Sequence, residues 1–199
     1  MFTGIIQSQG KILTREDNDD NISFSIATHF SDMGDVGLGD SIAMNGVCLT
    51  VTGIAQDVVS VDLSRETINV TDAAFWDVGT VLNLEKSLAL KDKLGGHMVS
   101  GHVDAMARCV KIEASGTSVI YGFEIPAAYD KFVVKKGSVA INGVSLTVNE
   151  IRDCILYVNL IPHTLQHTNL GRLALMDPVN FEIDTIARYV EKMLQGFKP

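Results

Sequence analysis

The segment SIAMNGVCLTVT at residues 41–52 recurs in the same chain as SVAINGVSLTVN at residues 138–149, with eight of twelve positions identical. The same offset of 97 residues places Thr67 on Thr164 and Glu85 on Glu182, and no gap is needed. Self-similarity at one fixed offset over many separated points indicates a repeated structural unit. The sequence therefore predicts a tandem duplication, with units at residues 1–96 and 97–185.

Short β-strands are the predicted elements of each unit. Residues 23–26 and 81–85 alternate between apolar and polar side chains, and residues 58–63 are rich in β-branched types, as is typical of strands. Asn-Gly pairs at 45–46 and 142–143 mark tight turns. With about six short strands per unit and no alternation of strand and helix, we expect an all-β fold of two six-stranded antiparallel barrels, each closing its own sheet edges.

The last residues change from a strand period to a helix period. Ile186, Val190, Met193 and Phe197 are spaced by four, three and four residues, which predicts a short C-terminal α-helix over residues 186–199 with one apolar seam. That seam either packs on its own barrel or seals an oligomer. In an oligomer the subunits would also have to touch elsewhere, because two heptads are too short to hold helices together alone.

Composition excludes several classes of function. The chain has 199 residues, 46% apolar content, a formal net charge of -8 and a pI near 5.0, which fits a globular protein and opposes binding to nucleic acid phosphates. We find no signal-peptide pattern and no run of 18 apolar residues, so we expect a cytoplasmic protein with no membrane segment.

Metal binding is not expected. Cys48, Cys109 and Cys154 are far apart and form no Cys-x-x-Cys pair, which fits a reducing compartment. His163 and His167 have helical spacing, but no glutamate lies between them as in hydrolytic zinc helices.

Five blocks of sequence resemble those of riboflavin synthases, in the same order and spacing. They are MFTGI at 1–5, NGVCLTV at 45–51, LGGHMVSGHVD at 94–104, KGSVAINGVSLTV at 136–148 and IPHTLQHTNLG at 161–171. The resemblance covers essentially residues 1–190. It implies two Greek-key barrels and a C-terminal helix, assembled as a homotrimer whose active sites lie between the first barrel of one subunit and the second barrel of a neighbour.

The resemblance also implies that the protein is an enzyme of the transferase class. Two molecules of 6,7-dimethyl-8-ribityllumazine bind at each site, and a four-carbon unit passes from one to the other. The products are riboflavin and 5-amino-6-(D-ribitylamino)uracil, and no cofactor is consumed. Lumazine synthase is a candidate partner.

Polar positions that differ between the repeats are the better catalytic candidates, because one lumazine donates carbons and the other accepts them. His102 stands opposite Ile5 in the offset and resembles the group that takes a proton from the acidic C7 methyl. Ser145 and Asp184 resemble the pair that positions a nucleophile at C7, either water or the serine itself. The alternatives are a core histidine, a turn serine and a helix N-cap aspartate.

Three further residues complete the catalytic set that the resemblance implies. Lys136 would stabilise anionic charge on the ring, although a solvated surface lysine is an equal alternative. Cys48, opposite Ser145, either acts as a transient nucleophile or, as we favour, is a small thiol that contacts the ligand. Thr147 is the third member.

The substrate-binding candidates are short polar side chains and exposed backbone groups, which suit a pyrimidinedione edge and a ribityl chain. They are Thr3, Gly4, Ile5, Ile6, Ser41, Cys48, Leu49, Thr50, Asp62, Leu63, Ser64, Arg65, Glu66, Thr67, Gly101, His102, Val103, Lys136, Ser145, Leu146, Thr147, Ile161, Pro162, His163, Thr164, Leu165 and Gln166. The main competing function is that of a non-catalytic lumazine or flavin antenna protein, in which one repeat has lost its polar residues. A barrel that serves only as an assembly scaffold is the third.

Overall fold

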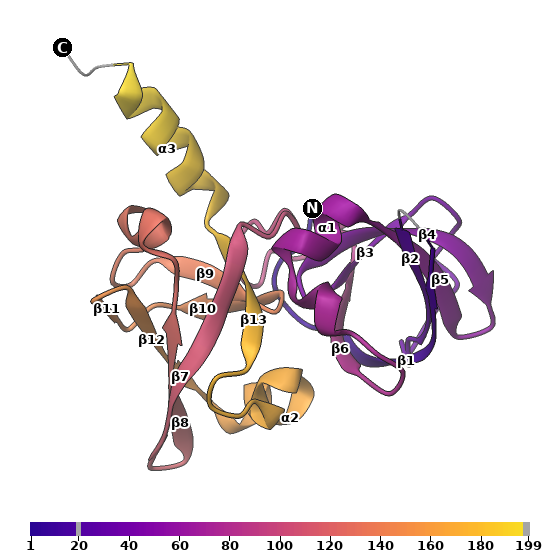
Figure 1. The fold of residues 1–199 in the computed structure, drawn as a ribbon, viewed down its shortest axis with the longest axis horizontal. Helices are drawn as coiled ribbons and strands as arrows, with labels where there is room; N and C mark the ends of the chain where they lie inside the picture. Colours follow the sequence, from indigo (N-terminus) through magenta and orange to yellow (C-terminus); the bar gives the residue numbers. More distant parts are fainter. Residues whose placement is uncertain (19–20, 197–199) are drawn as a thin grey trace.

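The computed structural model describes residues 1–18 and 21–196. It contains two β units side by side and one helix that projects away from them (Figure 1). The first unit is a closed antiparallel barrel in the order β1-β2-β5-β4-β3-β6. Its strands are β1 (Ser8–Asp17), β2 (Asn21–Ala27), β3 (Ser41–Met44), β4 (Val47–Ala55), β5 (Val58–Ser64) and β6 (Val81–Lys86).

The second unit is a curled sheet in the order β10-β9-β13-β7-β8-β12-β11. Its strands are β7 (Ala105–Ser115), β8 (Ser118–Glu124), β9 (Ser138–Ile141), β10 (Val144–Thr147), β11 (Glu150–Arg152), β12 (Ile155–Leu160) and β13 (Pro178–Ile183). It has seven strands rather than the expected six, because the counterpart of β4 is divided at residues 148–149. In β4 itself the register shifts at the same place, between Val51 and Gly53. The two edge strands β10 and β11 are therefore successive pieces of one chain segment.

Short helices follow β5 and β12 at corresponding places in the two units, and the sequence patterns did not predict them. Helix α1 (Arg65–Val70) begins after Ser64, whose side chain accepts the N–H of Thr67, and α2 (Pro162–His167) begins with a proline, whose ring favours the first helical position. Three 3-10 helices complete the units, namely η1 (Asp72–Phe75), η2 (Ala127–Phe132) and η3 (Asn169–Arg172).

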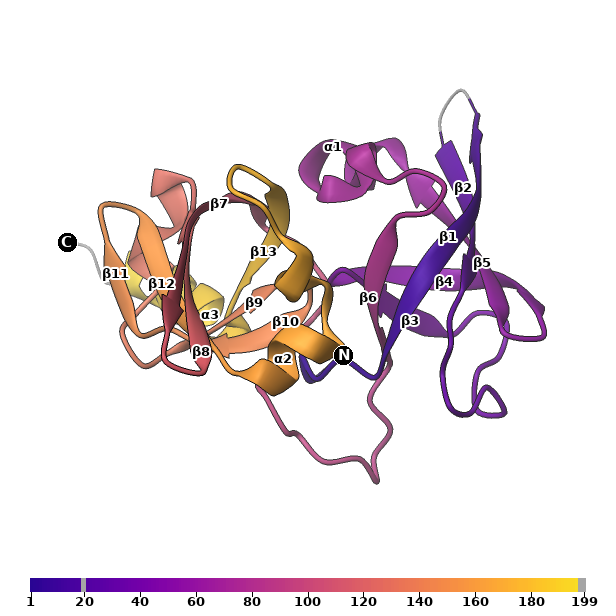
Figure 2. The same cartoon turned by 90° about the horizontal axis from the view of Figure 1, so that it is seen from below.

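Each unit has its own hydrophobic core, and a third apolar cluster lies between them. Phe24 packs edge-on against Trp76 in the first core, and Tyr121 stacks on Phe123 in the second. The third cluster consists of Phe2, Ala43, Val99 and Ala140, which are two pairs related by the offset of 97. The two units lie side by side (Figure 2), and the contact between them follows the internal repeat.

A buried polar network extends this contact between the units. Its members are three pairs related by the same offset, namely Asn45 with Asn142, Asn83 with Asn180, and Asp72 with Asn169. Asp72 is the single ionisable member. Its carboxylate accepts the indole N–H of Trp76 at 2.8 Å and the side-chain amides of Asn180 at 2.7 Å and Asn45 at 3.0 Å. Burial raises the pKa of Asp72 to about 6.

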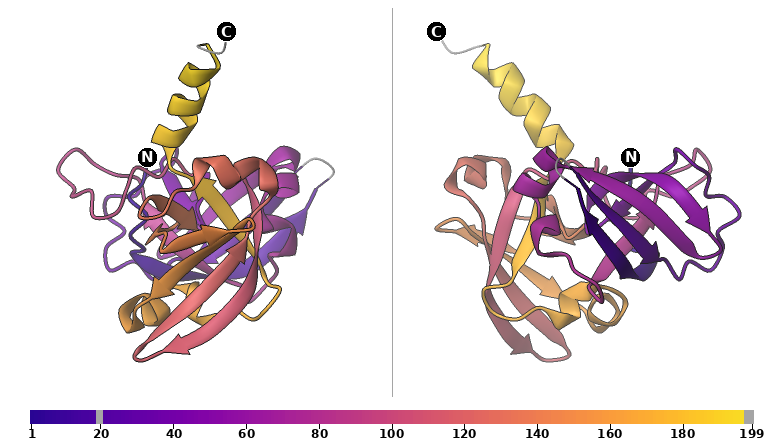
Figure 3. Two further views of the ribbon diagram at one scale, coloured as in Figure 1. Left: turned by 90° about the vertical axis from the view of Figure 1, so that its left-hand side faces the viewer. Right: turned by 45° about the vertical axis from the view of Figure 1, so that its right-hand side comes forward.

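Helix α3 (Thr185–Gln195) projects from the second unit (Figure 3). Arg188 on the helix donates to Asp104 of that unit at 2.8 Å. The helix was predicted over residues 186–199, and Phe197 of the predicted seam lies outside the described residues. Ile186, Val190 and Met193 are exposed, so the helix does not bury its seam on its own barrel. None of the described helices is both long and apolar enough to cross a membrane.

Candidate functional site

The starts of the two repeats pair with each other. Phe2 and Val99 form an isolated antiparallel bridge, with Phe2 N–H donating to Val99 O at 2.8 Å and Val99 N–H donating to Phe2 O at 3.1 Å. Both side chains are buried. Because Val99 is Phe2 displaced by 97 residues, the bridge lies on the pseudo-symmetry axis of the two units.

From this bridge, each start segment continues onto the other unit. Gly4 O accepts the N–H of Ser145 at 2.8 Å, and Gly101 O accepts the N–H of Cys48 at 2.9 Å. Both glycines have positive φ, +75° and +79°, and a Cβ on either would lie 2.5–2.6 Å from the Cβ of the residue it contacts. Only glycine allows so close an approach in this backbone conformation.

The side chains that follow the glycines confirm the exchange. Ile6 packs against the core of the second unit, and Val103 packs against the core of the first. The candidate binding residues therefore fall into two sets. In the first set, residues 101–103 lie beside residues 48–50 of the first barrel, next to the strand that leads into 62–67. In the second set, residues 4–6 lie beside residues 145–147 of the second barrel. The core of that barrel also contacts Leu165 of the 161–166 segment.

His97 contacts Ser145 directly through their side chains. Its Nδ1 lies 2.7 Å from Ser145 Oγ. The imidazole is buried, its Nε2 has no hydrogen-bond partner among the described residues, and burial lowers its pKa against a smaller opposite effect of Asp184. An unsatisfied buried nitrogen costs about 1–3 kcal/mol, and a catalytic role is one of the explanations for such a group in a native structure.

The other catalytic candidates lie around this pair or on the surface. The carboxylate of Asp184 accepts the N–H of Ile186 at 2.9 Å, so it is the N-cap of α3, and it is close enough for its charge to act on His97. His102, Lys136 and Thr147 are exposed. Lys136 has a positive φ of 69°, in the turn before β9.

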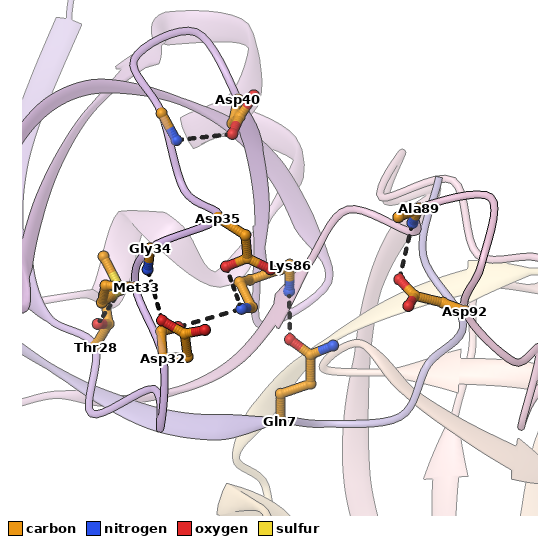
Figure 4. A network of polar contacts seen from close by, with 11 residues as sticks. Gln7, Thr28, Asp32, Met33, Gly34, Asp35, Asp40, Lys86, Ala89 and Asp92 are labelled. Carbon is orange, nitrogen blue, oxygen red and sulfur yellow. Dashed lines mark hydrogen bonds and ion pairs between the residues drawn. The ribbon is translucent and has the colours of Figure 1, made fainter.

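Two hollows occupy equivalent positions at the edges of the barrels. One of about 410 Å³ is lined by Ser41 and Ser87 of the first unit, and one of about 340 Å³ by their counterparts Ser138 and Asp184. In Figure 4, the first hollow is bordered by Lys86, which donates from Nζ to Asp35 at 2.6 Å and from its backbone N–H to the side chain of Gln7 at 3.0 Å. The expected ligand contact Ser41 thus faces an open, polar space.

Sequence reasoning missed His97, Glu85 and Glu182. His97 lies at the boundary of the two repeats and has no counterpart in the first unit, so it is an asymmetric polar residue that the comparison of paired positions could not select. The two glutamates are identical in both repeats, so a search for differences passed over them. Among the described residues, no group of three or more His, Cys, Asp or Glu side chains could hold a metal ion.

Similar proteins share both the sequence and the fold. The family model of the lumazine binding domain matches twice, at residues 3–87 and 100–184. A riboflavin synthase of Photobacterium phosphoreum is 38% identical over 199 residues, which are 100% of this chain and 91% of that protein. Two crystal structures of LumP, one with riboflavin and one with 6,7-dimethyl-8-(1'-D-ribityl) lumazine, align with TM-scores of 0.84 and 0.82 at 32% and 31% identity. Each alignment covers 92% of this chain and at least 98% of LumP.

Proposed function

Because this chain belongs to the riboflavin synthase family and contains two lumazine binding domains, we propose that it converts two molecules of 6,7-dimethyl-8-ribityllumazine into riboflavin and 5-amino-6-(D-ribitylamino)uracil. The observation that carries the proposal is that both barrels have a start segment from the other unit beside a short polar side chain, Ser145 in one and Cys48 in the other. A dismutation needs two sites for the same molecule, one for the donor and one for the acceptor of the four carbons.

In the proposed mechanism, Ser145 and His97 act at the second barrel. His97 is neutral near pH 7, because burial lowers its pKa, so its Nδ1 is able to accept the hydroxyl proton of Ser145. The serine, or a water in its place, then adds to C7 of the bound lumazine. Asp184 lies near enough to stabilise the imidazolium that forms. His102, exposed beside the first barrel, is placed to take the proton of the C7 methyl on the other lumazine.

The remaining parts of the proposal concern the assembly and the limits of the units. The exposed apolar seam of α3 is available for contacts between subunits, which supports self-association of the chain. A homotrimer with active sites shared between subunits is the assembly that we propose. We retain the division into residues 1–96, 97–185 and 186–199. Lys136 and Thr147 are exposed on the second unit, and we propose that they act at the ligand shared with a neighbouring subunit.

The competing function is that of a non-catalytic antenna protein that binds a lumazine or a flavin. The solved structures of LumP hold these two kinds of ligand, so the likeness to LumP is compatible with ligand binding alone. In such a protein one pocket would lack polar side chains. Here Cys48 and Thr50 in the first barrel match Ser145 and Thr147 in the second, and all four are at least partly exposed. This symmetry of polar groups favours the enzyme.

Incubation of the pure protein with the ribityllumazine alone separates the two functions. We expect riboflavin and the pyrimidinedione in equal amounts by chromatography. His97→Ala and Ser145→Ala should each lower turnover at least about tenfold with little loss of ligand affinity, since proton transfer acts mainly in the transition state. His29→Asn, in an exposed loop with a φ of 51°, is the matched control and should keep full activity. A ligand that binds and returns unchanged would exclude the enzyme.

A further inference from the structure

Two buried glutamates hold the start segments of the repeats in identical ways. Glu85 of β6 accepts the N–H and the hydroxyl of Thr3 at 2.7 and 2.6 Å and the N–H of Gly4 at 2.9 Å. Glu182 of β13 accepts the N–H and the hydroxyl of Ser100, both at 2.6 Å, and the N–H of Gly101 at 3.0 Å. The side chains are 2% and 3% exposed, so these bonds are shielded from water.

Each glutamate acts on the barrel to which it does not belong. Glu85 lies in the first unit and fixes Gly4, whose carbonyl receives the N–H of Ser145 in the second unit; Glu182 lies in the second unit and fixes Gly101, whose carbonyl receives the N–H of Cys48 in the first. We propose that Glu85 and Glu182 are crossed positioning residues: Glu85 holds the Gly4 segment against Ser145, and Glu182 holds the Gly101 segment against Cys48.

The chemistry of the donors explains why these residues are carboxylates. Three donors converge on two oxygens, and only an acceptor-only group satisfies all three. A glutamine would turn its amide N–H groups toward one of them. In the described part of the chain, neither glutamate forms an ion pair with a lysine, arginine or histidine. A buried carboxylate without a cation is costly, and burial accordingly raises the pKa of each one.

A glutamate that only stabilises the fold and a glutamate that positions the other unit differ in which unit loosens when it is replaced by glutamine. If the glutamates only held the fold together, Glu85→Gln would loosen its own first unit at least as much as the second. Crossed positioning predicts that Glu85→Gln loosens the second unit near Ser145 more than its own unit, because the Gly4 segment that it frees is hydrogen-bonded to Ser145. That these segments line ligand pockets rests on the proposed function, whereas the direction of the crossing is measurable without any turnover.

The test uses the thiol at position 48 and a thiol moved to position 145. In the full-length chain, the rate at which 4,4′-dithiodipyridine modifies Cys48 is measured for the natural protein, Glu85→Gln and Glu182→Gln. The natural protein, Glu85→Gln and Glu182→Gln are then each prepared with two further substitutions, Cys48→Ser and Ser145→Cys. These move the thiol from position 48 to the equivalent position 145. Peptide mapping by mass spectrometry separates either thiol from Cys109 and Cys154.

We expect Glu182→Gln to accelerate modification at position 48 about tenfold or more, as for the loss of a hydrogen bond to a charged group, and to leave the modification rate at position 145 unchanged. Glu85→Gln should do the opposite. Equal effects at both positions, or an effect confined to the variant's own unit, would overturn the crossing, even if the protein makes riboflavin. If a glutamine variant does not fold, Ser100→Ala and Thr3→Val, which each remove one donor, give the same two-by-two comparison.

Discussion

Replacing Asp72 by asparagine tests how the buried network between the two units titrates. The natural carboxyl has a pKa of about 6 because of burial, and the amides of Asn45 and Asn180 and the indole of Trp76 oppose that rise. An unfolded aspartate has a pKa near 3.8. Each unit of pKa difference corresponds to about 1.4 kcal/mol, so ionisation of the buried carboxyl lowers the free energy of unfolding by about 3 kcal/mol in total.

The sign of the effect follows from which state binds the proton first. Between about pH 6 and 4 the folded chain holds a proton on Asp72 that the unfolded chain does not hold. The free energy of unfolding of the natural protein should therefore rise, relative to that of Asp72→Asn, as the pH falls through this window. Above pH 6 the natural protein bears the full cost of the buried charge, and the difference between the two proteins should be constant.

The assay is urea unfolding followed by tryptophan fluorescence at several pH values from 7.5 to 4. Trp76 is the only tryptophan in the chain and donates to Asp72, so it reports on the network itself. Glu85 and Glu182 titrate in both proteins and cancel in the difference. Asp57→Asn, at an exposed turn, is the control and should show no such trend. A flat difference would mean that the three N–H donors cancel the effect of burial, and a difference that falls with decreasing pH would mean that they outweigh it; either result would refute the reasoning.

The remaining predictions concern assembly and the contact between units. Val190→Glu with Met193→Glu should give a smaller species by light scattering that keeps its β-type circular dichroism but loses activity, with partial recovery at high protein concentration; a fully active monomer would contradict sites shared between subunits. A fragment of residues 1–96 should fold yet make no product, and it should bind riboflavin more weakly than the full chain, because it lacks the 101–103 segment; turnover by this fragment would refute the two-barrel site. Gly143→Ala should lower the midpoint of thermal unfolding, since its φ is +76° and an added Cβ would lie 2.7 Å from the backbone nitrogen of Gly46; an unchanged midpoint would show that the two turns move apart freely.

The repeat, its strands and its Asn-Gly turns were predictable because they depend on local pattern. The segments predicted as strands at 58–63 and 81–85 lie within β5 and β6. Helices α1 and α2 escaped prediction because six residues are too few to show a helical period, although the capping Ser64 and the initial Pro162 are start signals.

The site was harder to predict, because its contacts join residues far apart in the sequence. Nothing local indicates that Gly4 reaches Ser145 or that Gly101 reaches Cys48. The comparison of repeats selected positions that differ, such as Cys48 against Ser145, and was by its nature blind to positions that the repeats share, such as Glu85 and Glu182. The contact of His97 with Ser145 depends on the crossing and could be found only in three dimensions.

The bridge between Phe2 and Val99 has a consequence for the origin of the chain. Contacts in which a residue meets its own equivalent across an axis are the mark of an isologous homodimer, and here Gly46 also meets Gly143 in this way. The two repeats thus have the geometry of a dimer whose protomers exchange their first residues, joined into one polypeptide by residues 87–96. An ancestral gene for a single repeat would have encoded such a swapped dimer. In a fused chain, unlike in such a dimer, the two equivalent positions can differ, as Cys48 differs from Ser145 and Asp72 from Asn169.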